Sequence, residues 1–227
     1  MATVLFSDNE PGEAFWKRIG WKERADLKVL QRATPTRKPG IKSTRGIEVS
    51  SMELTDQTLA AAVIAETTNC LNSCVSKIKH CLGQLTDEQV WWRPQEPMNS
   101  IGNLVLHLCG NVRQWIVAGI GGAPDVRDRP REFSERRVIP RSELSRQLDE
   151  VVAAAAEALA RMTPEEMLRV RCIQGFSVTG LGAIFDSVPH LKGHTQEIIC
   201  LTRMQLGDGY KFDWVPKTTE EGASMTP

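Results

Sequence analysis

The sequence has no excess of charge of either sign. Its 227 residues include 28 Lys or Arg and 28 Asp or Glu, so the formal net charge is zero. Proteins that bind nucleic acid through the phosphate backbone normally carry a clear basic excess. The balance therefore argues against nucleic acid as a partner.

Long hydrophobic runs are also absent. No stretch approaches the roughly 18 consecutive apolar residues of a membrane-spanning helix. The apolar start of the chain is interrupted at Asp8 and Glu10, too early for a signal peptide. We therefore expect no membrane partner and a cytoplasmic location. Hydrophobic residues still make up 41% of the chain, which is typical of a globular protein with an ordinary core.

The six cysteines include no CxxC pair, so the usual start of a zinc knuckle is missing. Six cysteines in a chain of this length also do not resemble the disulfide framework of a small secreted domain. We interpret them as reduced thiols that are buried as small hydrophobic side chains.

Residues 1–46 differ from the rest of the chain, with ten Lys or Arg against five Asp or Glu. Within them, residues 34–40 (TPTRKPG) hold two prolines, a glycine and no apolar residue, which is typical of a linker. We expect an N-terminal extension and linker over residues 1–46, a main domain over residues 47–215 and a flexible tail over residues 216–227.

Beyond the linker, apolar residues recur at helical spacings of three, four and seven. The pattern predicts four long helices, at residues 56–85, 100–118, 142–162 and 179–206. No segment shows sustained two-residue alternation, so we expect no sheet. Four long helices joined by long loops predict an all-α, up-down four-helix bundle preceded by a small N-terminal extension.

Two of the four histidines, His190 and His194, lie four residues apart on the last predicted helix. This spacing places both imidazoles on one face, an arrangement with which helices often bind a transition metal. Asp186 and Glu197 extend the same stripe. A histidine pair without a metal remains the alternative.

A second stripe lies on the helix predicted at residues 100–118. It consists of neutral polar residues on an otherwise apolar helix: Ser100, Asn103, His107, Asn111 and Gln114. A solvated face would carry Lys, Glu or Arg, so the stripe indicates the lining of an interior polar site. A hydrogen-bonded structural His107 is the alternative. His80 faces away from the apolar seam of its own helix, and we interpret it as a surface histidine.

Three segments of the chain resemble the DinB-like superfamily of bacterial metalloproteins. They are residues 91–94 (WWRP), 99–108 (NSIGNLVLHL) and 190–199 (HLKGHTQEII), and the resemblance covers about residues 50–215. It is greatest to a branch of uncharacterised DinB-like proteins.

This resemblance implies an up-down four-helix bundle, usually a homodimer, that binds a divalent metal through three histidines. The family pattern maps onto His107, His190 and His194. Members of known activity include transferases and isomerases that use a low-molecular-weight thiol. Pro189 departs from the pattern, because a proline inside a helix tends to kink it, and the effect of such a kink on His190 stays open at this point.

A shorter resemblance concerns residues 10–21 (EPGEAFWKRIGW), which are similar to the last helix and following strand of GNAT-type acetyltransferases. The part of that fold that binds the pyrophosphate of acetyl-coenzyme A would lie upstream and is missing. We interpret the segment as a remnant without activity. An adventitious amphipathic helix is the alternative.

Three neutral imidazoles leave metal positions open for water or substrate, as in catalytic rather than structural sites. Nitrogen ligands favour zinc or nickel over calcium or magnesium, which prefer oxygen. Glu197 is the candidate catalytic residue, either as a proton acceptor or as a group that holds a histidine ring. Asp186 is the other candidate for holding a ring.

Several arginines lie in or near the loop that follows the second predicted helix: Arg113, Arg127, Arg129, Arg131, Arg136 and Arg137. They fit either a solvated charged loop or an anion-recognising lid over the metal.

Two function classes follow from these patterns. The first is a metal-dependent enzyme that acts on a small-molecule substrate, either a transferase that uses a low-molecular-weight thiol or a hydrolase. The second is a non-catalytic metal-binding or stress-associated bundle.

Removal of residues 1–46 should leave the bundle folded, because these residues add nothing to its helical seam. We expect unchanged helicity by circular dichroism and unchanged metal binding in the truncated protein. A melting temperature lower by several degrees would instead mean that the extension packs onto the bundle.

Overall fold

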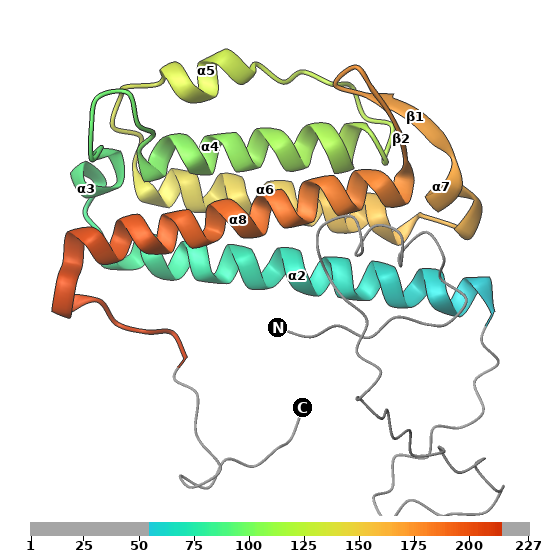
Figure 1. The fold of residues 1–227 in the computed structure, drawn as a ribbon, viewed down its shortest axis with the longest axis horizontal. Coiled ribbons are helices and arrows are strands. Elements are labelled where there is room, and N and C mark those ends of the chain that lie inside the picture. The colour runs from blue at the N-terminus through green and yellow to red at the C-terminus, as the bar shows by residue number, and fades with distance from the viewer. Residues whose placement is uncertain (1–54, 215–227) are drawn as a thin grey trace, which may run out of the picture. The chain divides into compact units, whose positions relative to one another are not determined.

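The computed structural model describes residues 55–214, which form a bundle of four long helices (Figure 1). These helices are α2 (Asp56–Gln84), α4 (Ile101–Val112) with its π-helical continuation η1 (Arg113–Ala118), α6 (Arg141–Ala160) and α8 (Gly180–Leu206). The predicted all-α four-helix bundle is confirmed. The expected extension and the expected tail at residues 216–227 lie outside the described residues, and the domain boundaries stay predictions.

Three of the four long helices, α2, α4 and α8, begin at side chains that cap them. Thr55 and Ser100 accept hydrogen bonds from the third backbone N–H of α2 and α4, respectively, and Thr179 does the same for α8. Such caps satisfy donors that the first helical turn leaves free. At the other end of α8, Gly207 has a φ of 51°, which favours glycine. Local sequence therefore sets the helix boundaries close to the predicted positions.

The core lies between the four helices and consists mainly of aliphatic side chains. The largest fully buried ones include Leu71, Ile78, Leu82, Leu104, Leu108, Ile116, Leu144, Leu148, Leu159 and Leu191. Each such side chain stabilises the fold by about 1.5–3 kcal/mol relative to an exposed position. The core fixes the distance between α4 and α8, the two helices that carry the histidines of interest.

The four helices do not simply alternate in direction. The backbone N–H of Arg141 donates to Asp87, three residues after the end of α2, and the Asn103 amide at the start of α4 donates to the Glu135 carbonyl. Both α4 and α6 therefore begin at this end of the bundle and run in the same direction. Figure 1 shows α2 and α8 running the opposite way, and the segment 119–140 returning along the length of α4.

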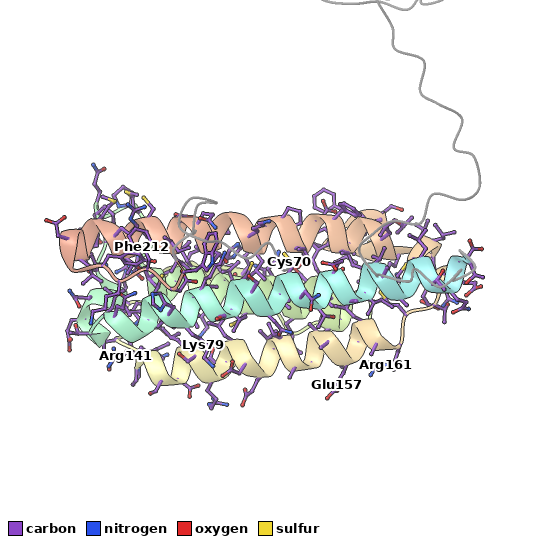
Figure 2. The ribbon with its side chains drawn as sticks, turned by 90° about the horizontal axis from the view of Figure 1, so that it is seen from below. Cys70, Lys79, Arg141, Glu157, Arg161 and Phe212 are labelled. Atoms are coloured by element: carbon purple, nitrogen blue, oxygen red, sulfur yellow. The ribbon has the colours of Figure 1, made fainter. Side chains whose placement is uncertain are left out.

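Figure 2 shows the bundle from its α2 side, with Arg141 and Arg161 at opposite ends of α6. Phe212, which follows the end of α8, lies at the Arg141 end. Along the seam between α2 and α6, Lys79 donates to Asp149 at 2.6 Å. Both side chains are largely exposed, so this ion pair adds little stability.

The returning segment 119–140, called the crossover below, contains a short helix that the sequence analysis did not predict. This helix is α5 (Arg129–Ser134). The expectation of a loop is therefore wrong at these residues. Asp128 accepts a hydrogen bond from the Arg131 backbone N–H, and Pro130 lies in the first turn. A capping aspartate followed by an early proline is a recognised helix start, so the signal was present.

The WWRP motif anchors the crossover to α4. Trp91, the last residue of the short helix α3 (Asp87–Trp91), donates its indole N–H to the Ile139 carbonyl at 2.9 Å. Arg93 donates to Asn103 at 2.6 Å and to the Glu135 carbonyl at 3.2 Å. Two residues of the motif, Trp91 and Arg93, thus contact the second half of the crossover.

A small antiparallel hairpin corrects the expectation that there would be no sheet. It follows the short helix α7 (Pro164–Leu168) and consists of β1 (Val170–Ile173) and β2 (Phe176–Thr179). The turn residues Gln174 and Gly175 both have positive φ, as two-residue hairpin turns of type I′ require. Strands of four residues are too short to show a clear two-residue alternation.

The cysteines are only partly as expected. All six are free thiols, but Cys172 and Cys200 are exposed rather than buried. Burial raises the pKa of Cys109 to about 12, so this thiol stays protonated at physiological pH. Among residues 55–214, none of the helices is both long and apolar enough to cross a membrane.

Candidate metal centre

The three predicted histidines converge in the interior of the bundle. His107 comes from α4, and His190 and His194 come from α8; one nitrogen from each lies within 4.8 Å of the others. The Nε2 atoms of His107 and His190 are 3.1 Å apart. Two nitrogen ligands about 2.0–2.1 Å from a tetrahedral ion would lie about 3.3 Å apart. The spacing therefore fits two ligands of a single ion.

Pro189 does not carry His190 away from this cluster. The helix α8 continues through the proline, which is exposed. The rings of His190 and His194 remain neighbours, with centroids 4.6 Å apart. Pro189 therefore leaves His190 within the histidine cluster.

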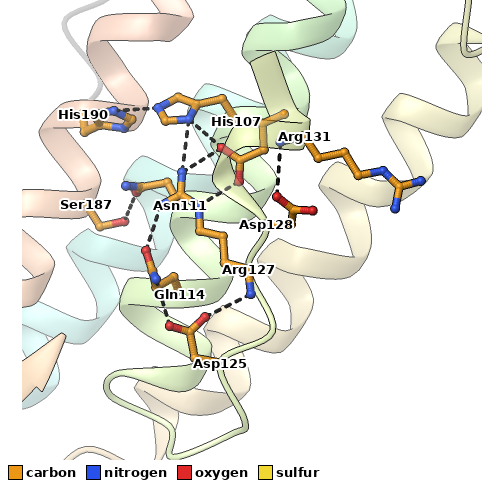
Figure 3. A network of polar contacts seen from close by, with 10 residues as sticks. His107, Asn111, Gln114, Asp125, Arg127, Asp128, Arg131, Ser187 and His190 are labelled. Carbon is orange, nitrogen blue, oxygen red and sulfur yellow. Dashed lines mark hydrogen bonds and ion pairs between the residues drawn. The ribbon is translucent and has the colours of Figure 1, made fainter. Parts of the chain in front are cut away.

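Glu132 on α5 holds the ring of His107, which Figure 3 shows beside His190 and Arg127. Its Oε2 lies 2.8 Å from Nδ1 of His107, and Arg127 donates to both carboxylate oxygens at 2.7 and 2.9 Å. The ionised carboxylate favours a hydrogen on Nδ1, although Nη2 of Arg127 also lies 3.1 Å from this nitrogen. This tautomer leaves the lone pair of Nε2 directed into the histidine cluster.

The Glu132 carboxylate is ionised although it is buried. Burial by itself raises its pKa, but the hydrogen bonds from Arg127 and His107 outweigh that effect and hold the pKa below its ordinary value. The side chains of Arg127 and Glu132 are only 3% and 9% exposed. A buried charge needs such a partner, so the two residues form one unit.

Glu132 was not predicted, because no pattern in the sequence links it to a histidine 25 residues away. Its partner Arg127 was among the six arginines considered. Arg127 and Arg129 line the cleft beside the histidines, whereas Arg131 points away from them in Figure 3. Of the six arginines that could form an anion-recognising lid, only Arg127 and Arg129 line the cleft. Arg127 is already paired with Glu132.

Gly110 makes room for the Glu132 carboxylate. It lies one turn after His107 on α4, and a Cβ at this position would come within 1.9 Å of Glu132 Oε1. A glycine is therefore required for the close approach of the crossover to the helix. This requirement is the one local signal that could have located the partner of His107.

A second layer of hydrogen bonds fixes Arg127. Its Nη1 donates to Gln114 at 2.9 Å, Gln114 donates to Asp125 at 2.8 Å, and Asp125 accepts from the Arg127 backbone N–H at 3.1 Å. Gln114 lies in the π-helix η1, a type of distortion that is frequent at functional sites. The closed ring of contacts holds the first part of the crossover against α4.

The polar stripe on α4 lines this interior site, as predicted. Besides His107 and Gln114, the Asn103 amide donates to the Glu132 carbonyl at 2.9 Å. Asn111 accepts from Ser187 on α8 at 3.0 Å. The neutral stripe thus faces the crossover and α8 rather than solvent.

The two histidines on α8 have different surroundings. His194 Nδ1 lies 2.7 Å from Glu197, whereas the buried Nδ1 of His190 has no hydrogen-bond partner among the described residues. Burial, together with the neighbouring His194, His107 and arginines, lowers the pKa of His190 to about 4. His190 is therefore neutral at physiological pH, the state in which an imidazole binds metal.

The other candidates lie apart from these contacts. Asp186 lines the adjacent cleft, and no hydrogen bond joins it to a histidine within residues 55–214. Nε2 of His80 lies 2.6 Å from the carbonyl oxygen of Lys211. His80 does not belong to the histidine cluster. Its side chain is half-buried, so it is less exposed than the expected surface histidine.

A cleft of about 490 Å³ lies beside His107 and His190. The crossover contributes Arg127 and Arg129 to its wall, and the hairpin contributes Phe176. Trp115 from η1 stacks with Phe176 at a centroid distance of 6.4 Å. These two aromatic residues were not predicted to line a site, because nothing in the sequence shows that the hairpin lies over η1.

The fold is a helical bundle with a cluster of three histidines between α4 and α8. Among solved structures, the chain is similar to a conserved protein from Enterococcus faecalis, at 17% identity and a TM-score of 0.54, over 64% of this chain and 98% of that chain. A DinB-like protein from Bacillus cereus ATCC 10987 is also similar, at 14% identity and a TM-score of 0.48, over 58% of this chain and 85% of that chain.

A family profile matches residues 58–219 of the chain, and the family is described as "Protein of unknown function (DUF1572)". The chain belongs to this family. No curated protein matches the sequence. The GNAT-like segment at residues 10–21 lies outside the described residues, and the homodimer and the cytoplasmic location stay predictions.

We expect Gly110→Ala to destabilise the protein, because the new methyl group would displace the buried Glu132 carboxylate from Arg127. A loss of about 1–3 kcal/mol, measured by thermal or urea unfolding, is the expected result. Gly193→Ala is the matched control, since it lies on α8 between the two histidines and its Cβ would meet nothing within 4 Å. This control should be neutral or slightly stabilising. Equal losses in both variants would contradict the role of Gly110.

Proposed function

We propose that this protein binds one divalent transition-metal ion through His107, His190 and His194. The observation that carries the proposal is the 3.1 Å approach of two Nε2 atoms from different helices. His194 supports it by bringing its own ring nitrogen into the same cluster. Three neutral imidazoles suit zinc or nickel better than calcium or magnesium.

The surroundings of the rings support the same proposal. A metal-binding histidine usually donates its other ring N–H to a carboxylate or a carbonyl, which fixes the tautomer and the ring orientation. His107 has Glu132 in this place and His194 has Glu197. In both rings Nε2 is then the free nitrogen. The donor set fits a metal ion better than it fits a purely structural hydrogen-bond network.

We further infer that the protein is a metal-dependent enzyme. A divalent ion on three protein ligands supplies an activated water or thiolate. The cleft beside His107 and His190 would admit a small-molecule substrate to this place. A transferase that uses a low-molecular-weight thiol and a hydrolase are the two reaction classes that this arrangement favours.

Glu197 is the proposed acid–base residue. One of its oxygens contacts His194, and its side chain is 41% exposed, so the second oxygen is free to accept a proton. The same contact would also orient the His194 ring. The two roles differ in their effect on metal content, which makes them separable by experiment.

A non-catalytic metal-binding or stress-associated bundle is the second candidate. The buried network of His107, Glu132 and Arg127 favours it, because an ion held there would tie the crossover to the bundle. In that case metal would raise stability without any metal-dependent turnover.

Replacing His194 by alanine should abolish stoichiometric metal, because two histidines provide too few ligands. Elemental analysis after dialysis against zinc or nickel is the measurement. His80→Ala should retain a full equivalent, since His80 lies outside the cluster. Full metal in the His194 variant, or loss of metal in the His80 variant, would overturn the three-histidine assignment.

Glu197→Gln, saturated with metal, should lower any thiol-transfer or hydrolysis rate by about 10²–10⁴-fold if Glu197 moves a proton. Turnover with and without metal in a screen of such reactions is the readout. An unchanged rate at full metal content would leave Glu197 only the role of orienting His194. No metal-dependent turnover in the unaltered protein would favour the non-catalytic candidate.

A further inference from the structure

The cleft beside the histidines has one wall that carries positive charge. Arg129 lines it, and its guanidinium lies 5.0 Å from the centroid of the Phe133 ring. Phe133 in turn packs against His107, with ring centroids 4.7 Å apart. This stack holds the cation of Arg129 near the histidine cluster.

Arg129 differs from its neighbour Arg127 in its pairing. Arg127 is neutralised by Glu132, whereas no carboxylate of residues 55–214 forms an ion pair with Arg129. The Arg129 guanidinium is therefore available for an anionic group, which it can bind through two parallel hydrogen bonds.

The wall formed by the hairpin and η1 is apolar. Phe176 is 60% exposed although it lines the cleft, and it stacks on Trp115 behind it. Val178 adds an aliphatic surface on the same strand. An exposed aromatic ring with a second ring behind it is a suitable surface for the apolar body of a ligand.

Asp186 is the one acidic side chain in the lining of the cleft. It would repel a second negative group on a ligand, since no basic partner among the described residues neutralises it. The volume of about 490 Å³ is in the range of clefts that hold small organic molecules.

We propose that the cleft binds a small organic monoanion, with its carboxylate or similar group on Arg129 and its apolar body against Phe176 and Trp115. This inference rests on the proposed function, because it names the substrate class of the same site. A molecule bound in this way lies beside His107 and His190, where the reaction would occur.

Four probes separate the parts of this proposal: 2-naphthoate, the neutral 2-naphthalenemethanol, the dianion 2,6-naphthalenedicarboxylate, and acetate. Binding to the full chain is measured by isothermal titration calorimetry, with and without one equivalent of zinc. We expect 2-naphthoate to bind at least fivefold more tightly than each of the other three. A neutral or dianionic probe that binds as tightly would overturn the monoanion assignment.

Variants test the residues. Arg129→Gln should weaken 2-naphthoate about five- to tenfold without affecting the neutral probe, and Arg129→Lys should restore part of the loss. Phe176→Ser should weaken both naphthalene probes. Arg131→Gln and Phe212→Ser are matched controls, because Arg131 points away from the site and Phe212 lies at the far end of the bundle. Equal effects in the variants and their controls would refute the proposal.

The two zinc conditions keep this proposal distinct from the metal site. If zinc does not bind but 2-naphthoate still depends on Arg129 and Phe176, the cleft assignment holds and the proposed metal function fails. If zinc binds and 2-naphthoate does not, only the cleft assignment fails. Binding that requires zinc but ignores Arg129 would place the carboxylate on the metal and overturn the role of Arg129.

Discussion

The buried carboxylate of Glu132 constrains more of this structure than any other single group. An ionised carboxylate in the interior is tolerated only when strong donors surround it, and here Arg127 and His107 provide them. Arg127 in turn is held by Gln114, and Gly110 leaves the space that the carboxylate occupies. The crossover is thereby fixed against α4, and the ring orientation of His107 is fixed with it.

The site combines a rigid half with a half that depends on the crossover. His190 and His194 are placed by the α-helix itself, whose geometry brings positions four apart onto one face. His107 needs α4 to be packed at the right distance from α8, and its ring also needs Glu132 from α5. A change in the crossover would therefore disturb one histidine while leaving the other two in place.

Two connections between the long helices, the crossover and the hairpin, shape the cleft. The crossover contributes Arg129, and the hairpin between α7 and α8 contributes Phe176. In a bundle with short turns, the histidines would face only other helices. The connections therefore decide what can reach the histidine cluster, whereas the helices decide where the cluster lies.

The sequence by itself determined the bundle, its helix boundaries and the three histidines, because helical periodicity, capping residues and the spacing of His190 and His194 are local patterns. It did not reveal Glu132 as the partner of His107, the hairpin, or the aromatic wall of Trp115 and Phe176. Only the tertiary structure decided these, since they depend on how the crossover and the hairpin fold back over α4 and η1. Contacts between residues far apart in the chain leave no periodic signal in one sequence.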